Sequence, residues 1–323
     1  MKRVSFLLCA LALFDLAGAH AVAQPYPNRT VSIVVPYPAG GSVDVVARLI
    51  AQKLNERFGQ NFIVENRGGG ASGAVGASFV ARATPDGYTL MLTASIHIIT
   101  PFLNKSLPYD AVKDFAPVTL VAAGPLIVST TPNMPVSSLK ELFELVRKDP
   151  NKYTFATSSF GSAGHLVVEL LKRDAGVDTL VIPYKGTAPL LTDIMGGQVQ
   201  LTADPMASSL PLARSGKIKA LAVTAMKRVA AAPDIPTIAE SGMTGFDFQS
   251  WYGLWGPKGL PADIAATLQA EVVQVLALPE VKERLAVLGF EAIGSTTAEF
   301  ARYIDDESAK YERIIRDAKI KAE

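Results

Sequence analysis

The sequence predicts an α/β protein built from mainly parallel sheets that are flanked by helices. Two observations support this class: short β-branched runs alternate with amphipathic stretches, and several of the helical stretches follow glycine-containing loops. The chain has 323 residues, of which 49% are hydrophobic. That length and composition allow a substantial buried core and about two domains.

The first α/β unit begins with the β-branched run 31–35, which predicts a strand. The glycine-containing loop 36–41 follows, and then the stretch 43–54 has apolar residues at helical spacing and polar residues on the other face. This order is strand, loop, helix. The rest of the unit is predicted as a strand at 62–64, a small-residue helix over 73–83 and a strand at 89–93.

The pattern then restarts and predicts a second α/β unit. Its predicted strands are 118–122, 126–130, 153–157, 180–183, 199–203 and 219–224. Its predicted helices are 137–148, 165–175 and 189–195. The helix at 165–175 follows a loop with two glycines, so each unit opens a helix from such a loop.

The last third departs from this alternation. It predicts a short helix over 234–242, an aromatic run over 246–255 and helices over 262–278, 279–288 and 298–319, the last opened by a capping box at Thr296 and Glu299. With no new strands after the aromatic run, these helices are expected to pack on the first unit. The chain then crosses between units near 123–124 and in the aromatic run, which predicts a hinge. We expect one domain of 24–124 with 250–323 and a second of 125–249.

The chain opens with the pattern of a secretory signal peptide over 1–23. Basic residues precede an apolar stretch, 4–19, and small residues alternate with others before Ala23. The apolar stretch has about 16 residues, fewer than the ~20 of a spanning helix, and Asp15 interrupts it. Cys9, the single cysteine, leaves with the signal. We therefore expect cleavage after Ala23, which leaves an exported chain without any disulfide. Such a chain fits a bacterial periplasm, because domains secreted by animal cells usually carry disulfides.

Charge and composition argue against several function classes. The chain carries 31 Lys+Arg against 30 Asp+Glu, so it has no electrostatic footprint for nucleic acid. One cysteine and three histidines leave little for a zinc site of the usual kind. We expect a monomer without metal or cofactor.

Two helix N-termini are the candidate ligand site. Unpaired backbone N–H groups and the helix dipole favour an anion there, and glycine permits close approach. The candidates are Gly40, Gly41 and Ser42 in the first unit, and Ser159, Gly161 and Ser162 in the second. Charge-assisted hydrogen bonds contribute about 1.5–3 kcal/mol each, whereas association costs roughly 4–15 kcal/mol. Hydrogen bonds at one end of a ligand would not offset this cost of association, so both ends must be bound. This favours a dicarboxylate-like molecule.

Further candidates each have a structural alternative. Tyr37 is a lid over the ligand or a packed loop aromatic, and Ser95 is a donor or a turn former. Lys185, beside Gly186, is a cation near the second terminus or a solvated side chain. Asp204 accepts from a ligand hydroxyl or ammonium or caps its loop. His165 donates to the ligand or caps locally.

Six segments in this order resemble the solute receptors of tripartite tricarboxylate transporters, also called Bug proteins. They are 36–44, 65–70, 85–89, 184–186, 196–198 and 236–242. The resemblance implies a two-domain periplasmic binding protein fold of type II, with a cleft that captures a small carboxylate for a membrane partner. It also implies that the loop Ala39–Gly41 holds one carboxylate, partly through water, and that the loop Ser158–Ser162 holds the far end.

Two other functions stay open at this point. An exported sensor needs the same closing cleft, so the sequence does not separate it from a transport receptor. A secreted serine hydrolase would use Ser162 or Ser159, but Phe160 stands where a nucleophile elbow has glycine. His165 follows Ser162 by three positions on the same helix start, which suits capping better than proton relay.

Overall fold

The structure is a computed structural model, and it describes residues 26–320. The expected signal segment 1–23 and its cleavage after Ala23 lie outside the described residues. The described strands form one sheet in the order β2-β1-β3-β9-β4-β7-β5-β6, with β10 and β8 also pairing with β4. Their bounds are β1 Val31–Val35, β2 Phe62–Asn66, β3 Thr89–Ala94, β4 Phe115–Thr130, β5 Phe155–Thr157, β6 Val181–Pro183, β7 Leu201–Pro205, β8 Lys219–Val223, β9 Gln249–Pro257 and β10 Glu291–Ala292.

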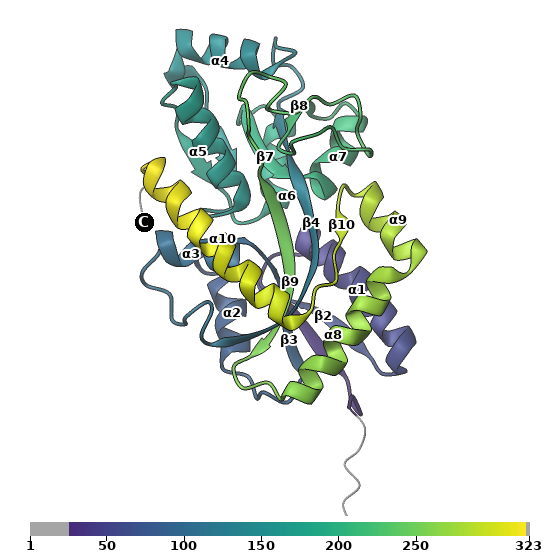
Figure 1. The fold of residues 1–323 in the computed structure, drawn as a ribbon. Coiled ribbons are helices and arrows are strands. Elements are labelled where there is room, and N and C mark those ends of the chain that lie inside the picture. Colours follow the sequence, from purple (N-terminus) through teal and green to yellow (C-terminus); the bar gives the residue numbers. More distant parts are fainter. Residues whose placement is uncertain (1–25, 321–323) are drawn as a thin grey trace, which may run out of the picture.

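The long strand β4 joins the two ends of the molecule (Figure 1). It pairs with β9 up to Pro125, with β7 from Leu126 onward and with β8 from Ile127 onward. We call the part around β1, β2, β3 and β9 the first lobe, and the part around β5, β6, β7 and β8 the second lobe. Parallel pairs lie at both ends of the sheet, whereas its centre is antiparallel.

Helices cover both faces of the sheet in each lobe. The first lobe has α1 Ser42–Phe58, α2 Ala74–Ala81, α3 Ile96–Leu103, α8 Ala262–Ala277, α9 Pro279–Val287 and α10 Thr297–Asp317. The second has α4 Leu139–Lys148, α5 Ala163–Ala175, α6 Thr187–Met195 and α7 Met206–Arg214. Short 3-10 turns lie at Ala71–Gly73 and Pro150–Lys152.

The alternation of side chains along the strands explains this layering. In β1, Val31, Ile33 and Val35 pack in the core with α1 and α8, while Val34 packs in the core with α2, α3 and α10. Both faces of the strand are thus buried, which explains why it reads as a continuous apolar run. The capping box expected at Thr296 and Glu299 is present at the start of α10.

The α/β fold class predicted from the sequence is confirmed, but the sheet is mixed rather than mainly parallel, because β4 and β9 pair antiparallel with their neighbours. Single elements also differ from the prediction. The predicted helix over 234–242 is wrong, because this segment forms turns and Thr237 bridges to Val223 of β8. The two strands predicted at 118–122 and 126–130 are one strand, β4. The aromatic run is itself the strand β9, and helices α3 and α7 and strand β10 were not predicted.

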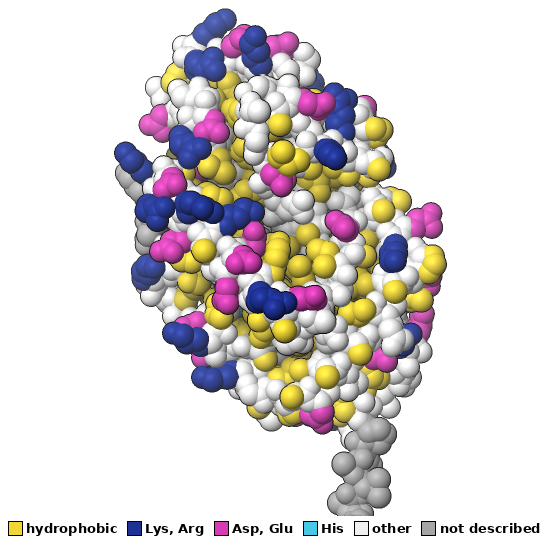
Figure 2. Space-filling model, in the orientation of Figure 1, with side chains coloured by type: hydrophobic (Ala, Val, Ile, Leu, Met, Phe, Trp, Pro, Cys, Tyr) yellow, Lys and Arg dark blue, Asp and Glu magenta, His cyan; other side chains and the backbone are white. Residues whose placement is uncertain are grey.

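The described surface has no strong charge asymmetry in the view of Figure 2. Basic and acidic side chains are interspersed on that face, with apolar side chains between them (Figure 2). Within residues 26–320, no single helix is long and apolar enough to cross a membrane; α8 and α9 meet that test only as a pair, which is bent by 74°.

Candidate functional site

The predicted site residues lie at the carboxyl ends of parallel strands, where ligands bind in open α/β sheets. In the first lobe, Tyr37, Ala39, Gly40, Gly41 and Ser42 follow β1, and Ser95 follows β3. In the second lobe, Ser158, Gly161, Ser162 and His165 follow β5, Lys185 and Gly186 follow β6, and Asp204 is near the end of β7.

The strand register places the carboxyl ends of the parallel strands of both lobes beside the middle of β4. Ala94, the last residue of β3, pairs with Tyr252 of β9, which in turn pairs with Ala122 of β4. Asp204 pairs with Ile127 of the same strand. Five positions along a strand span about 17 Å. The edge of each lobe therefore lies close to the crossing between the lobes.

The two lobes touch each other beside these loops. A Cβ placed on Gly186 would lie 3.3 Å from Pro38 Cγ, so the loop after β6 contacts the loop after β1. A Cβ on Gly161 would lie 3.4 Å from a methyl carbon of Leu103 in α3. The Ser72 hydroxyl donates to the carbonyl oxygen of Phe160 at 2.6 Å. These contacts join loops that are far apart in sequence.

The N-terminus of α1 has no side-chain cap. Its N-cap residue is Gly41, which has no side chain to accept a hydrogen bond from the N–H groups of the first turn. Orphan N–H groups of this kind suit an anion. The Gly40 N–H is already used, because it donates to Asp44 Oδ2 at 3.0 Å.

Asp44 faces its own helix and strand β2, where its charge is neutralised. Its carboxylate accepts from Arg48 Nε at 3.0 Å and from Asn66 Nδ2 at 2.9 Å. Burial acts to raise the pKa of Asp44, but the hydrogen bonds from Arg48, Gly40 and Asn66 together hold that pKa below its usual value. This carboxylate therefore does not cancel the positive end of α1.

The remaining first-lobe candidates differ in their polar contacts. Tyr37 shares a 2.8 Å hydrogen bond with the Thr93 hydroxyl, and burial raises the pKa of Tyr37 well above its usual value. The Ser42 hydroxyl accepts from Tyr252 at 3.0 Å. The Ser95 hydroxyl is buried and has no hydrogen-bond partner among the described residues. Ser95 is thus the side chain here with an unused hydrogen-bonding capacity.

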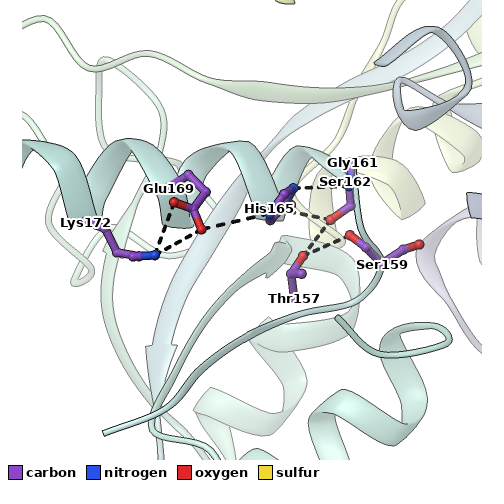
Figure 3. Close-up of polar contacts among 7 residues, drawn as sticks. All are labelled: Thr157, Ser159, Gly161, Ser162, His165, Glu169 and Lys172. Atoms are coloured by element: carbon purple, nitrogen blue, oxygen red, sulfur yellow. Dashed lines mark hydrogen bonds and ion pairs between the residues drawn. The ribbon is translucent and has the colours of Figure 1, made fainter. Parts of the chain in front are cut away.

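The N-terminus of α5 is capped from within the second lobe (Figure 3). The Ser162 hydroxyl accepts from the His165 N–H at 3.1 Å and shares a 2.7 Å hydrogen bond with Thr157. The Gly161 N–H donates to His165 Nδ1 at 3.2 Å. Fewer N–H groups remain for a ligand here than at α1, so the two helix termini are not equivalent.

His165 is a neutral side chain in this arrangement. Burial, with a smaller contribution from Lys172, lowers its pKa to about 4. Its Nδ1 accepts from Gly161, and its Nε2 lies 4.0 Å from Glu169, which also contacts Lys172 at 3.2 Å (Figure 3). Nδ1 thus accepts from the loop that opens α5, while Nε2 faces Glu169. Its role as a ligand donor stays a prediction.

The loop after β6 and the end of β7 complete the second-lobe edge. The Gly186 N–H donates to the Ser158 carbonyl oxygen at 2.7 Å, and Lys185 is exposed. Asp204 is fully buried and accepts from Thr187 at 3.2 Å and from Ser208 at 2.5 Å. Burial raises the pKa of Asp204 to about 7 although these hydroxyls, and that of Ser158, lower it.

Sequence reasoning missed several side chains that hold these candidates in place. Thr187 directly follows Gly186 and opens α6, so its position at a helix start was a usable signal. Ser208 lies on α7, a helix that was not predicted. Tyr252 and Ser72 had no local signal, because their partners are distant in sequence.

The described residues offer no cluster for a metal ion. Within 26–320, no group of three or more His, Cys, Asp or Glu side chains lies close enough to hold one. The hydrogen-bonding groups described above are amides, hydroxyls, one imidazole and the buried carboxylates of Asp44 and Asp204, which suit binding of a small polar organic molecule.

The chain is similar to known proteins over most of its length. The family model of the tripartite tricarboxylate transporter family receptor matches residues 46–320. Protein BugT of Bordetella pertussis is 33% identical over 322 residues, which cover 98% of this chain and 98% of BugT.

Solved structures of other proteins are also similar to this chain in sequence and fold. The periplasmic binding protein BugD is 37% identical, with a TM-score of 0.88 over 92% of this chain and 100% of BugD. The protein Rpa4515 of R. palustris, solved with adipate, is 37% identical, with a TM-score of 0.90 over 92% of this chain and 100% of that protein. BugD and Rpa4515 thus share both the fold and more than a third of the sequence with this chain.

Proposed function

The chain belongs to the tripartite tricarboxylate transporter receptor family, and we propose that it captures a small di- or tricarboxylate between its lobes and delivers it to the membrane components of such a transporter. The observation that carries the proposal is the meeting of the loops from both lobes. Pro38 of the first lobe lies against Gly186 of the second, beside the carboxyl ends of β1 and β6. A molecule held there touches both lobes.

The first lobe holds one carboxylate with main-chain amides. The first turn of α1 lacks a side-chain cap, and the charge of Asp44 is balanced by Arg48. The N–H groups of Gly41 and Ser42 and the positive end of the helix dipole then favour a ligand carboxylate. The hydroxyl of Ser95, buried and unpartnered among the described residues, is a further donor in this lobe.

The second lobe holds the other end of the ligand. The loop Ser158–Ser162 and the loop Lys185–Gly186 lie side by side there, joined by the hydrogen bond from Gly186 to Ser158. The structural relative BugD is a periplasmic binding protein, and Rpa4515 was solved with adipate, a dicarboxylate. A ligand with a carboxylate at each end fits the distribution of polar groups over both lobes.

The membrane partner recognises the closed arrangement of the two lobes. A ligand that contacts both lobes stabilises the arrangement in which they touch. The hinge lies where Thr224 ties the two crossing segments, because it binds Leu126 N–H at 2.8 Å and the Phe248 carbonyl at 2.6 Å. We assign 24–124 with 250–323 to one domain and 125–249 to the other, in a monomer that acts in the periplasm after cleavage at Ala23.

We propose binding without catalysis. The Ser162 hydroxyl is engaged by Thr157 and by the main-chain N–H of His165, and the His165 ring accepts from Gly161 rather than from Ser162. A serine nucleophile needs the imidazole as its base. This geometry argues against the hydrolase alternative.

Titration calorimetry with mono-, di- and tricarboxylates tests the proposal on the parent and on Gly41→Val. Gly41 has φ −78°, and a Cβ there would meet only Pro38 O at 3.9 Å, so the variant is expected to fold. Its branched side chain covers the first-turn amides, and loss of two charge-assisted hydrogen bonds weakens binding by at least about 100-fold. Gly196→Val, at φ −79° beyond α6, is the matched control with parental affinity. Failure of every di- and tricarboxylate to bind the parent, or parental affinity in Gly41→Val, contradicts the proposal.

A further inference from the structure

Asp204 is a fully buried carboxylate on the second-lobe edge. Three hydroxyls from three different elements surround it: Ser158 after β5, Thr187 at the start of α6 and Ser208 in α7. Such a cluster is a built polar site, because each hydroxyl comes from a separate segment and all three point at one carboxyl group. Hydroxyls can either donate or accept, so they suit the protonated and the ionised carboxyl equally.

No cation balances this carboxylate. Within residues 26–320, no Lys, Arg or His nitrogen lies within 4 Å of Asp204. Tyr252 of β9 is the titratable side chain that faces it from the first lobe, and Ile127 of β4 pairs with it in the sheet. Lys185 on the neighbouring loop is exposed. The ionised form is therefore supported by neutral groups alone, in agreement with a pKa raised to about 7 by burial.

The two ends of the proposed site differ in charge. At α1 the carboxylate of Asp44 is paired with Arg48, so the amides of the first turn face an incoming anion unopposed. At the second lobe, Asp204 has no such partner. A ligand that is ionised at both ends brings its far carboxylate towards this buried carboxylate, and two adjacent carboxylates do not both stay ionised.

We propose that Asp204 couples the capture of a dicarboxylate to the uptake of one proton from solvent, which the Asp204 carboxyl and the far carboxylate of the ligand then share. The inference rests on the proposed function, and it specifies the ligand: a dicarboxylate held as the mono-protonated pair with Asp204. The hydroxyls of Ser158, Thr187 and Ser208 reorient to accept or donate around the shared proton.

The coupling predicts a specific pH dependence of the affinity. Above about pH 7 the free protein has an ionised Asp204, so binding takes up a proton and Kd rises about tenfold per pH unit. Well below about pH 7 Asp204 is already protonated, and Kd becomes insensitive to its titration.

Titration calorimetry with adipate, in several buffers of different ionisation enthalpy, counts the protons directly. The dependence of the observed enthalpy on the buffer gives close to one proton taken up per adipate at about pH 8.5 and little uptake at about pH 6. In Asp204→Asn, which keeps the shape of the side chain but not its titration, uptake at the higher pH disappears and the Kd for adipate no longer changes with pH. Asp174→Asn, the same charge change at an exposed position near the far end of α5, keeps parental uptake.

The outcomes separate the two proposals. Adipate binding by the parent without proton uptake at about pH 8.5 overturns the coupling and leaves carboxylate capture standing. Uptake that persists unchanged in a folded Asp204→Asn variant also overturns it, because another group then takes the proton. If Asp204→Asn does not fold, the parental proton count decides. If no dicarboxylate binds at either pH, capture itself fails.

Discussion

Removing the hydroxyl of Ser72 tests whether contact between the lobes contributes to ligand affinity. This hydroxyl donates to the Phe160 carbonyl oxygen at 2.6 Å, so it links the first lobe to the loop that opens α5. Ser72 has φ 54°, a conformation that is strained for any residue with a Cβ. Replacement by alanine keeps the Cβ and therefore the same backbone strain, and it deletes only the contact between the lobes.

The size of the effect follows from this one hydrogen bond. A neutral hydrogen bond contributes about 0.5–1.5 kcal/mol net, which corresponds to a rise in Kd of about 2- to 12-fold. In the proposed closing cycle the ligand-bound form makes this contact and an open form lacks it, so the full difference is expected in the affinity.

Calorimetric titration of the Ser72→Ala variant with adipate measures this difference. Ser215→Ala is the control, because the Ser215 hydroxyl donates to Pro211 and Leu212 at the end of α7, within the second lobe. We expect weaker binding by the first variant and parental binding by the second. Equal Kd values for Ser72→Ala and the parent refute the reasoning that the lobes close over the ligand.

Three further predictions concern stability. In Gly164→Ala, the new Cβ would lie 2.0 Å from the Ala203 carbonyl oxygen, so α5 must move off β7 and urea unfolding shows a loss of about 1–3 kcal/mol. Thr224→Val leaves the buried Leu126 N–H without its acceptor and lowers stability by about 1–3 kcal/mol, seen as a lower midpoint with an unchanged slope. The pKa of His165 falls from 6.5 to about 4 on folding, so stability drops by up to about 1.4 kcal/mol per unit as pH decreases between these values. His165→Gln removes that part of the acid sensitivity, and identical pH profiles contradict the assignment of a neutral buried ring.

Local sequence patterns were sufficient to predict the elements that depend only on neighbouring residues. The loop before α1 was predicted from a β-branched run, two glycines and a helical spacing, all within 31–54. The capping box of α10 was likewise predicted from Thr296 and Glu299. Each of these signals depends on neighbours in sequence, so no tertiary information was needed.

Elements that depend on tertiary contacts were missed. Two strands with a crossing near 123–124 were predicted, yet β4 runs through this segment because β9 pairs with it on one side. Helix α7 contains Pro211 and two serines, which weaken its helical pattern. It is stabilised because Met206 and Leu210 pack in a buried apolar cluster of the second lobe. The contribution of long-range packing is not visible in a window of sequence.

The site shows the same division. The glycine loops were placed at strand ends by pattern alone, but the inequality of the two helix termini was not foreseen. It arises because Gly41 has no side chain with which to cap α1, whereas Ser162 caps α5 and His165 accepts from Gly161. The burial of Asp204 among hydroxyls depends on α7, which the sequence did not predict.

A crystal structure of the mature protein with adipate tests the central claim most directly. The account predicts one carboxylate of adipate at the first-turn amides of α1, near Gly41 and Ser42, and the other beside Ser158 and Asp204, so that one molecule contacts both lobes. Adipate bound to a single lobe, or at a position remote from these loops, contradicts the account.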